Sequence, residues 1–330
     1  MPEKLSGYRL AWSTDWAALF GEQRPLILEI GFGRGSFLAH LARQNPDASI
    51  IGLEISNRCL VAAESLIARE RLTNVRVIHS TAEMALSHLF EPTTIREIYI
   101  NFPDPWFKAD HSHRRLMQRD TIDALVSRLI PGGMLSLATD ISAYAEMSAE
   151  LLAQTPGLTN TLPAAWVNEM QGRIVTKYEQ IARNEGRTCY YFAYQRNDSP
   201  APDVPVIREL DMPHIVFTSP LTLDEMQARF EEWHFDEGET HIHYMSMYRG
   251  RPGLLFEVHV GEATIVQRLA LLVSERSKRE GREYTLAVNG MGHPRATKGV
   301  HRAVSLLGDW LLSLHPDAQT VINKVAVNDD

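Results

Sequence analysis

The sequence predicts an α/β domain with a mostly parallel sheet, followed by an α+β domain. Between residues 26 and 153, short apolar runs alternate with segments of helical periodicity, which is typical of a parallel sheet with helices on both faces. The stretch RNDSPAPDVP, residues 196–205, is rich in Pro, Asp and Ser and predicts a linker. Beyond it, the predicted strands 240–248 and 254–260 follow one another without a helix between them. We therefore expect a first domain at 1–198, a linker at 199–205 and an accessory domain at 206–330.

The first domain is defined by five apolar runs and the helices between them. The predicted strands are Leu26–Ile30, Ser49–Leu53, Val75–Ile78, Glu97–Ile100 and Met134–Thr139. The predicted helices are Ser36–Arg43, one that Ser56 caps, Thr81–Phe90, Arg114–Leu129 and Ser142–Ala153. Residues 1–24 predict a leader with a short helix, in which Trp12, Trp16 and Phe20 serve packing. Two late strands, Arg173–Val175 and Cys189–Gln195, suggest an antiparallel edge.

The second domain shows a different order of elements. Its predicted strands are Ile215–Thr218, Thr240–Tyr248, Leu254–Val260, Tyr284–Val288 and Val321–Val325. Its predicted helices are Leu223–Trp233, Ala263–Arg279 and Gly299–Leu314.

Composition is that of an ordinary globular protein, with 44% apolar and 22% charged residues among 330. No apolar run is long enough to cross a membrane, the first residues lack the apolar core of a signal peptide, and Cys59 and Cys189 cannot form a disulfide framework. We therefore expect a reduced, cytoplasmic protein without a membrane anchor or a stable protein partner. The net charge of −8 argues against bulk nonspecific binding of nucleic acid, but it allows a local basic face.

A glycine-rich turn follows the first strand. The spacing Gly31-x-Gly33-x-Gly35 lets the backbone approach a ligand closely, and Ser36 stands where a dinucleotide-binding fingerprint needs its third glycine. This spacing, after a strand that contains Glu29, suits S-adenosylmethionine, which has no pyrophosphate. Taken alone, the triplet could also be a plain tight turn. Glu54 lies 19 residues after Gly35, where nucleotide-binding α/β folds hold a ribose diol, although a solvated acid at a helix start is the alternative.

The stretch Asn101–Arg115, NFPDPWFKADHSHRR, follows the fourth strand. Pro103 and Pro105 fix the backbone on both sides of Asp104, so this carboxylate stands on a stiff turn at a strand end, where open α/β sheets place their chemistry. A structural proline loop is the alternative. The turn resembles the D/N-P-P-Y/F turn of amino-group methyltransferases, except that Asp104 separates the prolines. The basic cluster that follows could hold phosphates or simply face solvent.

Several motifs together resemble one family. They are Glu29–Gly35 (EIGFGRG), Glu54, Asn101–Lys108 (NFPDPWFK), Arg114-Arg115, Ala138–Asp140 (ATD) and Thr176–Glu179 (TKYE). In this order, over about residues 20–195, they resemble the bacterial tRNA (guanine-N7-)-methyltransferase (TrmB) family. The resemblance implies a class I S-adenosylmethionine-dependent methyltransferase fold, Rossmann-like, with a mostly parallel seven-stranded sheet.

The resemblance also implies roles for individual residues. The cofactor contacts are then Glu29, Gly31, Gly33, Gly35, Glu54, Thr81 and Asp104, with Asp104 at the active centre. The guanosine contacts are Lys108, Asp140, Thr176, Lys177, Tyr178 and Glu179, and the RNA contacts are Arg114 and Arg115. Two departures stand out. Thr81 replaces an Asp that is frequent in the family, and Asp110, Ser112 and His113 dilute its basic run. Residues beyond about 205 lie outside the core family pattern.

The expected reaction is methyl transfer from S-adenosylmethionine to N7 of a variable-loop guanine, position 46, in tRNA. Guanine N7 carries a lone pair and no proton, so alignment matters more than a general base. Asp104, together with Asp140, is expected to hydrogen-bond the guanine N–H edge and to offset the developing positive charge. The alternatives are a methyltransferase with another RNA or amino-group target, or a protein that binds S-adenosylmethionine or tRNA without turnover.

The second domain offers two weaker hypotheses. His241, His243 and His259 lie on neighbouring predicted strands and could face a metal ion, but scattered surface histidines are the simpler interpretation and we expect no metal. A basic face could form from Lys278, Arg279, Arg282, Arg295, Lys298 and Arg302, with an ordinary solvated surface as the alternative.

Overall fold

The structure is a computed structural model that describes residues 5–105, 115–276 and 282–326. The chain divides into two compact units, Met1–Arg208 and Glu209–Asp330, which are described separately below. No helix in the described ranges has the length and apolar character needed to cross a membrane.

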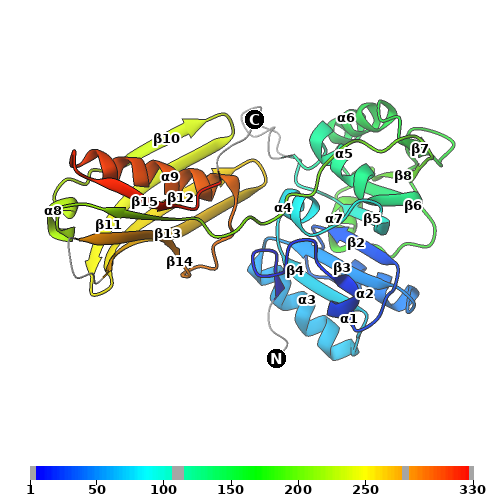
Figure 1. Ribbon diagram of the computed structural model, residues 1–330. Helices are drawn as coiled ribbons and strands as arrows, with labels where there is room; N and C mark the ends of the chain where they lie inside the picture. The colour runs from blue at the N-terminus through cyan, green and yellow to red at the C-terminus, as the bar shows by residue number, and fades with distance from the viewer. Residues whose placement is uncertain (1–4, 106–114, 277–281, 327–330) are drawn as a thin grey trace. The chain divides into compact units, whose positions relative to one another are not determined.

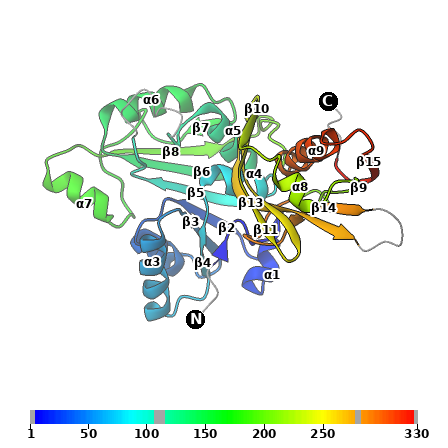
Figure 2. The ribbon, with the colours of Figure 1, turned by 90° about the vertical axis from the view of Figure 1, so that its left-hand side faces the viewer.

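The first unit contains an eight-stranded sheet. In spatial order its strands are β1 (Leu5–Ser6), β4 (Val75–His79), β3 (Ser49–Glu54), β2 (Leu26–Ile30), β5 (Ile95–Asn101), β6 (Leu129–Thr139), β8 (Tyr190–Arg196) and β7 (Leu158–Asn160). The six strands from β1 to β6 pair in parallel, while β8 is antiparallel to both β6 and β7. Figure 2 shows β5, β6 and β8 side by side. The chain reverses its direction of winding between β2 and β5, which is where sheets of this kind bind ligands.

Seven helices accompany this sheet within the described residues. They are α1 (Trp16–Phe20), α2 (Ser36–Gln44), α3 (Asn57–Glu70), α4 (Ala82–His88), α5 (Arg119–Arg128), α6 (Ser142–Ala153) and α7 (Lys177–Asn184). All five residues of β2 are buried, as expected for a central strand covered on both faces. The alternating α/β pattern of the sequence is thus confirmed, and the fold is that of a class I methyltransferase.

Three local predictions for this unit need correction. The two-residue strand β1 pairs with β4 and adds an eighth strand that the sequence pattern did not predict. The segment 173–175 forms no strand, because Arg173 turns inward rather than joining the sheet ladder. The helix predicted at Arg114–Leu129 begins at Arg119 within the described residues.

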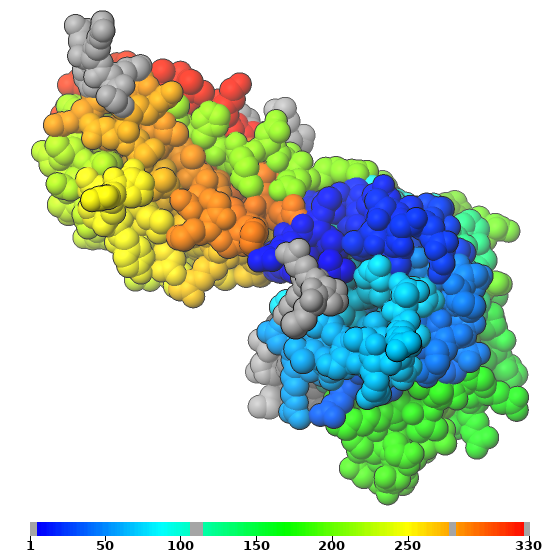
Figure 3. Space-filling view, turned by 90° about the horizontal axis from the view of Figure 1, so that it is seen from below, coloured from blue at the N-terminus to red at the C-terminus, as the bar shows by residue number. Residues whose placement is uncertain are grey.

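The N-terminal aromatics pack against the first unit, as predicted. The ring of Trp12 lies 3.9 Å from that of His88, and Trp16 stacks on Phe90 at 4.7 Å. Both tryptophans are buried. In Figure 3 the dark blue N-terminal segment accordingly lies against the light blue and cyan residues.

The segment predicted as a linker is held to the first unit. The fully buried Arg128 donates hydrogen bonds to the carbonyl oxygens of Val204 at 2.9 Å and of Leu86 at 2.9 Å. The backbone N–H of Ile207 donates to the carbonyl of Ser87 at 2.9 Å. This segment, although rich in Pro and Asp, is therefore an extended strap that is fixed to the first unit, because the buried Arg128 guanidinium donates hydrogen bonds to its carbonyl groups.

The second unit is built on a seven-stranded antiparallel sheet. In spatial order its strands are β10 (Trp233–Glu237), β11 (Thr240–Gly250), β12 (Gly253–Glu262), β13 (Ile265–Arg276), β14 (Glu283–Asn289), β9 (His214–Thr218) and β15 (Gln319–Asn323). Helix α9 (Lys298–Ser313) packs on the sheet, and α8 (Leu223–Gln227) contacts β11 and β12 (Figure 1). The core contains Phe217, Tyr244, Phe256 and Leu307, all nearly inaccessible to solvent.

Two helix predictions in this unit were wrong. The residues Ala263–Arg279 were predicted as a long helix, but Ile265–Arg276 is strand β13. Its residues alternate between buried and exposed at the start, and a two-residue turn after Glu262 joins it to β12. The leucine-rich composition favoured a helix, and tertiary pairing on both edges overrode it. The helix predicted at Leu223–Trp233 ends at Gln227, and Trp233 begins β10.

Candidate active site

The glycine turn between β2 and α2 is open toward a pocket. Gly31, Gly33 and Gly35 have φ angles of 72°, 58° and 81°, which side chains rarely adopt. A Cβ on Gly35 would lie 2.7 Å from the Cβ of Ala63, so this glycine lets α2 approach α3. A Cβ on Gly31 would meet no atom within 4 Å, and this open side leaves room for a ligand against the backbone.

Glu54, at the end of β3, holds this turn in place. One carboxylate oxygen accepts a hydrogen bond from the N–H of Gly33 at 3.0 Å, and the other accepts from Ile55 and Ser56, both at 2.9 Å. A carboxylate has about four acceptor positions, so about one remains for an outside hydroxyl group. The ribose contact expected of Glu54 stays a prediction, and it would have to use the single acceptor position that remains.

Glu29 is a buried carboxylate at the edge of the pocket. Its Oε1 accepts a hydrogen bond from Asn101 Nδ2 at 3.1 Å, while Oε2 has no partner among the described residues. Burial raises its pKa from about 4.5 to about 8, and the Asn101 hydrogen bond and the charge of Arg173 only partly oppose this shift. A buried oxygen without a donor is costly, so this atom points to a cationic or N–H ligand group.

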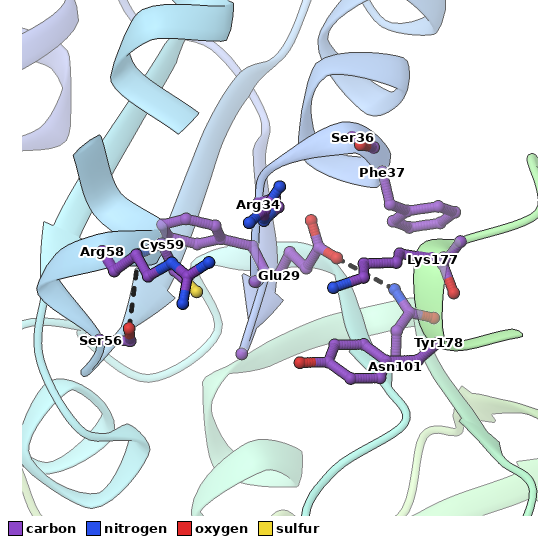
Figure 4. Close-up of a pocket in the computed structure, with 14 residues that line it drawn as sticks. Glu29, Arg34, Ser36, Phe37, Ser56, Arg58, Cys59, Asn101, Lys177 and Tyr178 are labelled. Carbon is purple, nitrogen blue, oxygen red and sulfur yellow. Dashed lines mark hydrogen bonds between the residues drawn. The ribbon is translucent and has the colours of Figure 1, made fainter. Parts of the chain in front are cut away.

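The pocket has a volume of about 260 Å³ and lies against the glycine turn. Its lining comes from β2, the turn, α2, the start of α3, the end of β5 and the start of α7. In Figure 4 the carboxylate of Glu29 points toward Asn101, with Arg58 on one side of it and Tyr178 on the other. The arrangement can enclose an amino-acid-like ammonium group next to an unhindered backbone.

Three cations surround this pocket. Arg34, Arg58 and Lys177 all line it and are exposed, and none pairs with an acidic side chain in the described part of the chain. Lys177 Nζ lies 5.7 Å from the centre of the Tyr178 ring. In a chain of net charge −8, such a group of cations favours an anionic ligand at the mouth of the pocket.

The proline turn carries Asp104 at the end of β5. Phe102 just before it has a φ of 52°, an uncommon conformation for a bulky residue, and its N–H donates to the carbonyl of Ala138 at 2.7 Å. Asp104 is exposed, and Arg115 Nε donates to the carbonyl of Pro105 at 3.2 Å. The acid thus stands on a fixed backbone. Lys108 and Arg114, predicted to contact guanosine and RNA, lie outside the described residues.

Asp140 follows β6 at the same edge of the sheet as Asp104. Residues Asn101 and Ala138 pair directly across β5 and β6, so the two acids extend from neighbouring strand ends. Asp140 forms an ion pair with Arg187. Thr81 follows β4, which β3 and β2 separate from β5, and it caps α4 by accepting a hydrogen bond from the N–H of Met84 at 3.2 Å.

The segment Thr176–Glu179 begins helix α7. Thr176 and Glu179 form a capping box, in which each side chain accepts a hydrogen bond from the backbone N–H of the other. Glu179 is buried and also accepts from the Tyr191 hydroxyl at 2.8 Å and from Arg183 at 2.6 Å. Lys177 and Tyr178 are exposed and line the pocket. The structure therefore brings this segment to the glycine turn, although it lies more than a hundred residues away in sequence.

Sequence reasoning assigned no role to the cations Arg34 and Arg58 that line the pocket, and it missed three further residues. Asn101 and Arg173 lie between Glu29 and the α7 segment, and Phe102 adopts the unusual backbone of the turn. Asn101 could have been found as the polar residue that ends a buried strand. Nothing local distinguishes Arg173, since its partners are distant in sequence.

The hypotheses for the second unit receive little support. Within the described residues, no group of three His, Cys, Asp or Glu side chains could hold a metal ion. His241 pairs with Asp236 and His243 with Glu232, each at 2.6 Å. Of the proposed basic face, Arg282, Arg295 and Arg302 pair with Glu275, Glu209 and Glu237, Lys298 begins α9, and Lys278 and Arg279 lie outside the described residues.

Sequence comparisons agree with the site. A family described as putative methyltransferases matches residues 23–192. A tRNA (guanine-N(7)-)-methyltransferase of Thermus thermophilus is 33% identical over 303 residues, which is 91% of this chain and 93% of that protein. A tRNA (guanine-N(7)-)-methyltransferase of Burkholderia cenocepacia is 41% identical over 182 residues, 55% of this chain and 71% of that protein. The Thermus match extends through both units.

Solved methyltransferase structures align with part of this chain at low similarity. The 16S rRNA methyltransferase KamB aligns over 59% of this chain and 99% of its own, with 14% identity and a TM-score of 0.43. A putative methyltransferase of Streptococcus mutans, solved in complex with SAH, aligns over 53% of this chain and 89% of its own, with 11% identity and a TM-score of 0.35.

Proposed function

We propose that this chain, which belongs to the tRNA (guanine-N7-)-methyltransferase family, transfers a methyl group from S-adenosylmethionine to N7 of guanine 46 in the tRNA variable loop. The observation that carries the proposal is the buried Glu29 carboxylate, one oxygen of which has no partner in the part of the chain that the structure describes, beside an open glycine turn. That pocket lies at the reversal point of the sheet, next to the turn that carries Asp104.

The residues of the pocket fit S-adenosylmethionine. Glu29 Oε2 can accept a hydrogen bond from the α-ammonium group, and the backbone at Gly31 and Gly33 admits close contact with the methionine part. Glu54 retains about one acceptor position for a ribose hydroxyl, and Thr81 offers only a hydroxyl toward an adenine amino group. When bound, S-adenosylmethionine supplies an electrophilic sulfonium methyl group.

The chemistry of the substrate defines what the protein must do. Guanine N7 has a lone pair and no proton, so the site needs to align N7 with the methyl group and exclude water. Asp104 accepts hydrogen bonds from the guanine N–H edge and offsets the positive charge that develops on the ring. Lys108, Asp140 and Thr176–Glu179 are the further proposed guanosine contacts, and Arg114 and Arg115 the RNA contacts.

The exposed cations support a nucleic-acid substrate. Arg34, Arg58 and Lys177 can contact phosphates on either side of a guanosine that enters the pocket. Such a base must leave its stack to reach a pocket, and loop nucleotides do so at the lowest cost. An exposed loop of tRNA meets this requirement better than a duplex does.

The test is methylation of unmodified tRNA with labelled S-adenosylmethionine, followed by nucleoside mass spectrometry and mapping of the modified position. We expect N7-methylguanosine at one variable-loop guanine. If the labelled methyl group is found on an exocyclic amine, the protein is a methyltransferase with a different target atom. Binding of both ligands without transfer would identify a non-catalytic binding protein instead.

A further inference from the structure

A continuous line of polar contacts joins the cofactor pocket to helix α7. It begins at Glu29 on β2, passes through Asn101 on β5 and Arg173 in the loop before α7, and reaches Glu179 by way of Tyr191 on β8. The Asn101 contacts each join residues 72 positions apart in sequence. The line therefore exists only in the folded protein.

The orientation of Asn101 is determined by its two neighbours. Its Nδ2 donates to Glu29 Oε1 at 3.1 Å, and its Oδ1 accepts from an Arg173 Nη at 2.6 Å. Because a guanidinium can only donate and a carboxylate oxygen accepts, a reversed amide would lose both contacts. Arg173 thus fixes the orientation of the Asn101 amide, which holds the carboxylate of Glu29.

Two aromatic rings hold the guanidinium of Arg173. Its central carbon lies 4.9 Å from the ring centre of Phe37 and 5.3 Å from that of Tyr191. Phe37 belongs to α2 directly after the glycine turn, and it lines the pocket. Burial lowers the pKa of Arg173, while nearby Glu179 and Glu29 oppose that shift, so one half-buried cation lies between two buried acids.

Tyr191 connects Arg173 to the start of α7, because it contacts both Arg173 and Glu179. Its hydroxyl donates to Glu179 Oε1 at 2.8 Å, and Glu179 in turn completes the capping box with Thr176. Burial raises the pKa of Tyr191, so the hydroxyl keeps the proton that it donates. A displacement of Arg173 would therefore disturb both the amide at Glu29 and the turn that presents Lys177 and Tyr178 to the pocket.

We propose that Arg173 is a positioning residue that couples the cofactor site to the guanosine-contacting segment Thr176–Glu179, so that cofactor and tRNA each strengthen the binding of the other. Linkage makes this effect reciprocal, and couplings of this kind typically lie between about 5-fold and 150-fold. The inference rests on the proposed function, because it takes tRNA as the second ligand. Arg173 itself is not among the residues that line the pocket.

The experiment measures the dissociation constant of S-adenosylhomocysteine with and without saturating tRNA, in the full-length protein. We expect tRNA to lower it at least about 5-fold in the wild type and not at all in Arg173→Met. Arg173→Lys keeps the charge but not the planar two-ended donor, so it should retain part of the coupling. Steady-state kinetics should show a raised KM for tRNA in Arg173→Met, with a smaller change in kcat.

Arg183→Met is the matched control. Arg183 also pairs with Glu179, but its side chain is 48% exposed and it has no contact with Asn101. Solvent partly screens Arg183 in its pair with the buried Glu179, so this variant should keep the coupling. Circular dichroism verifies that each variant folds. If Arg173→Met does not fold, the coupling measured in Arg173→Lys, which should be reduced, tests the inference instead.

Two outcomes would overturn the inference. One is a wild type without coupling, and the other is undiminished coupling in the Arg173 variants while the wild type still methylates tRNA. A wild type that binds S-adenosylhomocysteine but never forms N7-methylguanosine would contradict the proposed function instead. The binding and product measurements thus separate the two failures.

Discussion

The two units differ in how their unpaired charged groups are distributed. In the first unit, Glu29 keeps one buried oxygen that has no partner among the described residues, and within the same ranges Arg34 and Arg58 have no acidic partner around a pocket. In the second unit, Arg282, Arg295 and Arg302 pair with acids, as Arg295 does with Glu209 at 2.8 Å, although Glu262 Oε2 is also buried without a partner among the described residues. Polar groups that lack partners cost stability, so their concentration in one place indicates a ligand that supplies them.

The balance of charge supports the same distinction. Residues 209–330 contain 18 acidic and 12 basic residues, and those arginines of the suggested basic face that the structure describes, Arg282, Arg295 and Arg302, are ion-paired. An acidic, internally paired surface is a poor phosphate ligand. The comparison therefore assigns the ligand chemistry to the first unit, and the role of the second unit stays a prediction.

The largest expected effect is at Asp104. Asp104→Ala should lower kcat by about 10²–10³-fold, since it removes a preorganised acceptor from the charge that develops on guanine. Single-turnover methylation of tRNA measures it. The control is the affinity for S-adenosylhomocysteine, which we expect to change much less than kcat. Near-normal turnover would show that this acid is only part of a structural loop.

Glu29→Gln should weaken cofactor binding by about 10–100-fold, because a charge-assisted hydrogen bond to the ammonium group is lost. Calorimetry in buffers of different ionisation enthalpy gives a second measurement. At pH 7 the free Glu29, whose pKa is about 8, is mostly protonated, so ammonium binding should release a proton from the wild type but not from the variant. Equal proton release in both would show that Glu29 is not the ammonium ligand.

The same substitution should stabilise the protein without ligand. Between pH 4.5 and about 8 the folded chain keeps a proton on Glu29 that the unfolded chain releases, so the free energy of unfolding falls as pH rises. The slope is at most about 1.4 kcal/mol per pH unit. Urea unfolding at pH 6 and pH 8 should show that Glu29→Gln removes this dependence. An unchanged slope would place the titration elsewhere.

Replacement of the pocket cations should have a moderate effect. Arg58→Ala should raise the dissociation constant for tRNA several-fold and reduce the slope of log affinity against log salt by about one phosphate contact. Binding assays over a range of salt concentrations measure both quantities. Arg268→Ala in the second unit is the matched control, since Arg268 is paired with Glu257 and should leave the slope unchanged. Equal slopes for wild type and Arg58→Ala would refute the contact.

The smallest effect is expected at the second unit's histidines. His243→Ala removes a pair whose side chains are 37% and 64% exposed, and such pairs contribute only about 0–1 kcal/mol. Thermal unfolding should show a shift of a few degrees at most, and added Zn²⁺ should stabilise neither protein. A strong, histidine-dependent zinc effect would reverse the contrast between the two units.

Sequence patterns were sufficient where the signal is local. The buried run Leu26–Ile30, the glycines after it and the proline turn at Asp104 each have a short-range physical cause, and these predicted the first fold and the place of the site. The helix predicted at Ala263–Arg279 was wrong because apolar content alone does not distinguish a helix from a strand paired on both edges. The site roles of Glu54 and Glu179 stay predictions, since both carboxylates also serve the protein's own backbone.

By itself, the sequence determined the alternation of strands and helices, the turn chemistry and the residue types gathered at strand ends, because these depend on neighbours along the chain. Only the tertiary structure decided that Arg173 lies between Glu29 and Glu179, that Arg128 holds the strap at Val204, and that Glu29 Oε2 is buried without a partner. Burial and long-range hydrogen bonds set these features, and neither is encoded by any short stretch of residues.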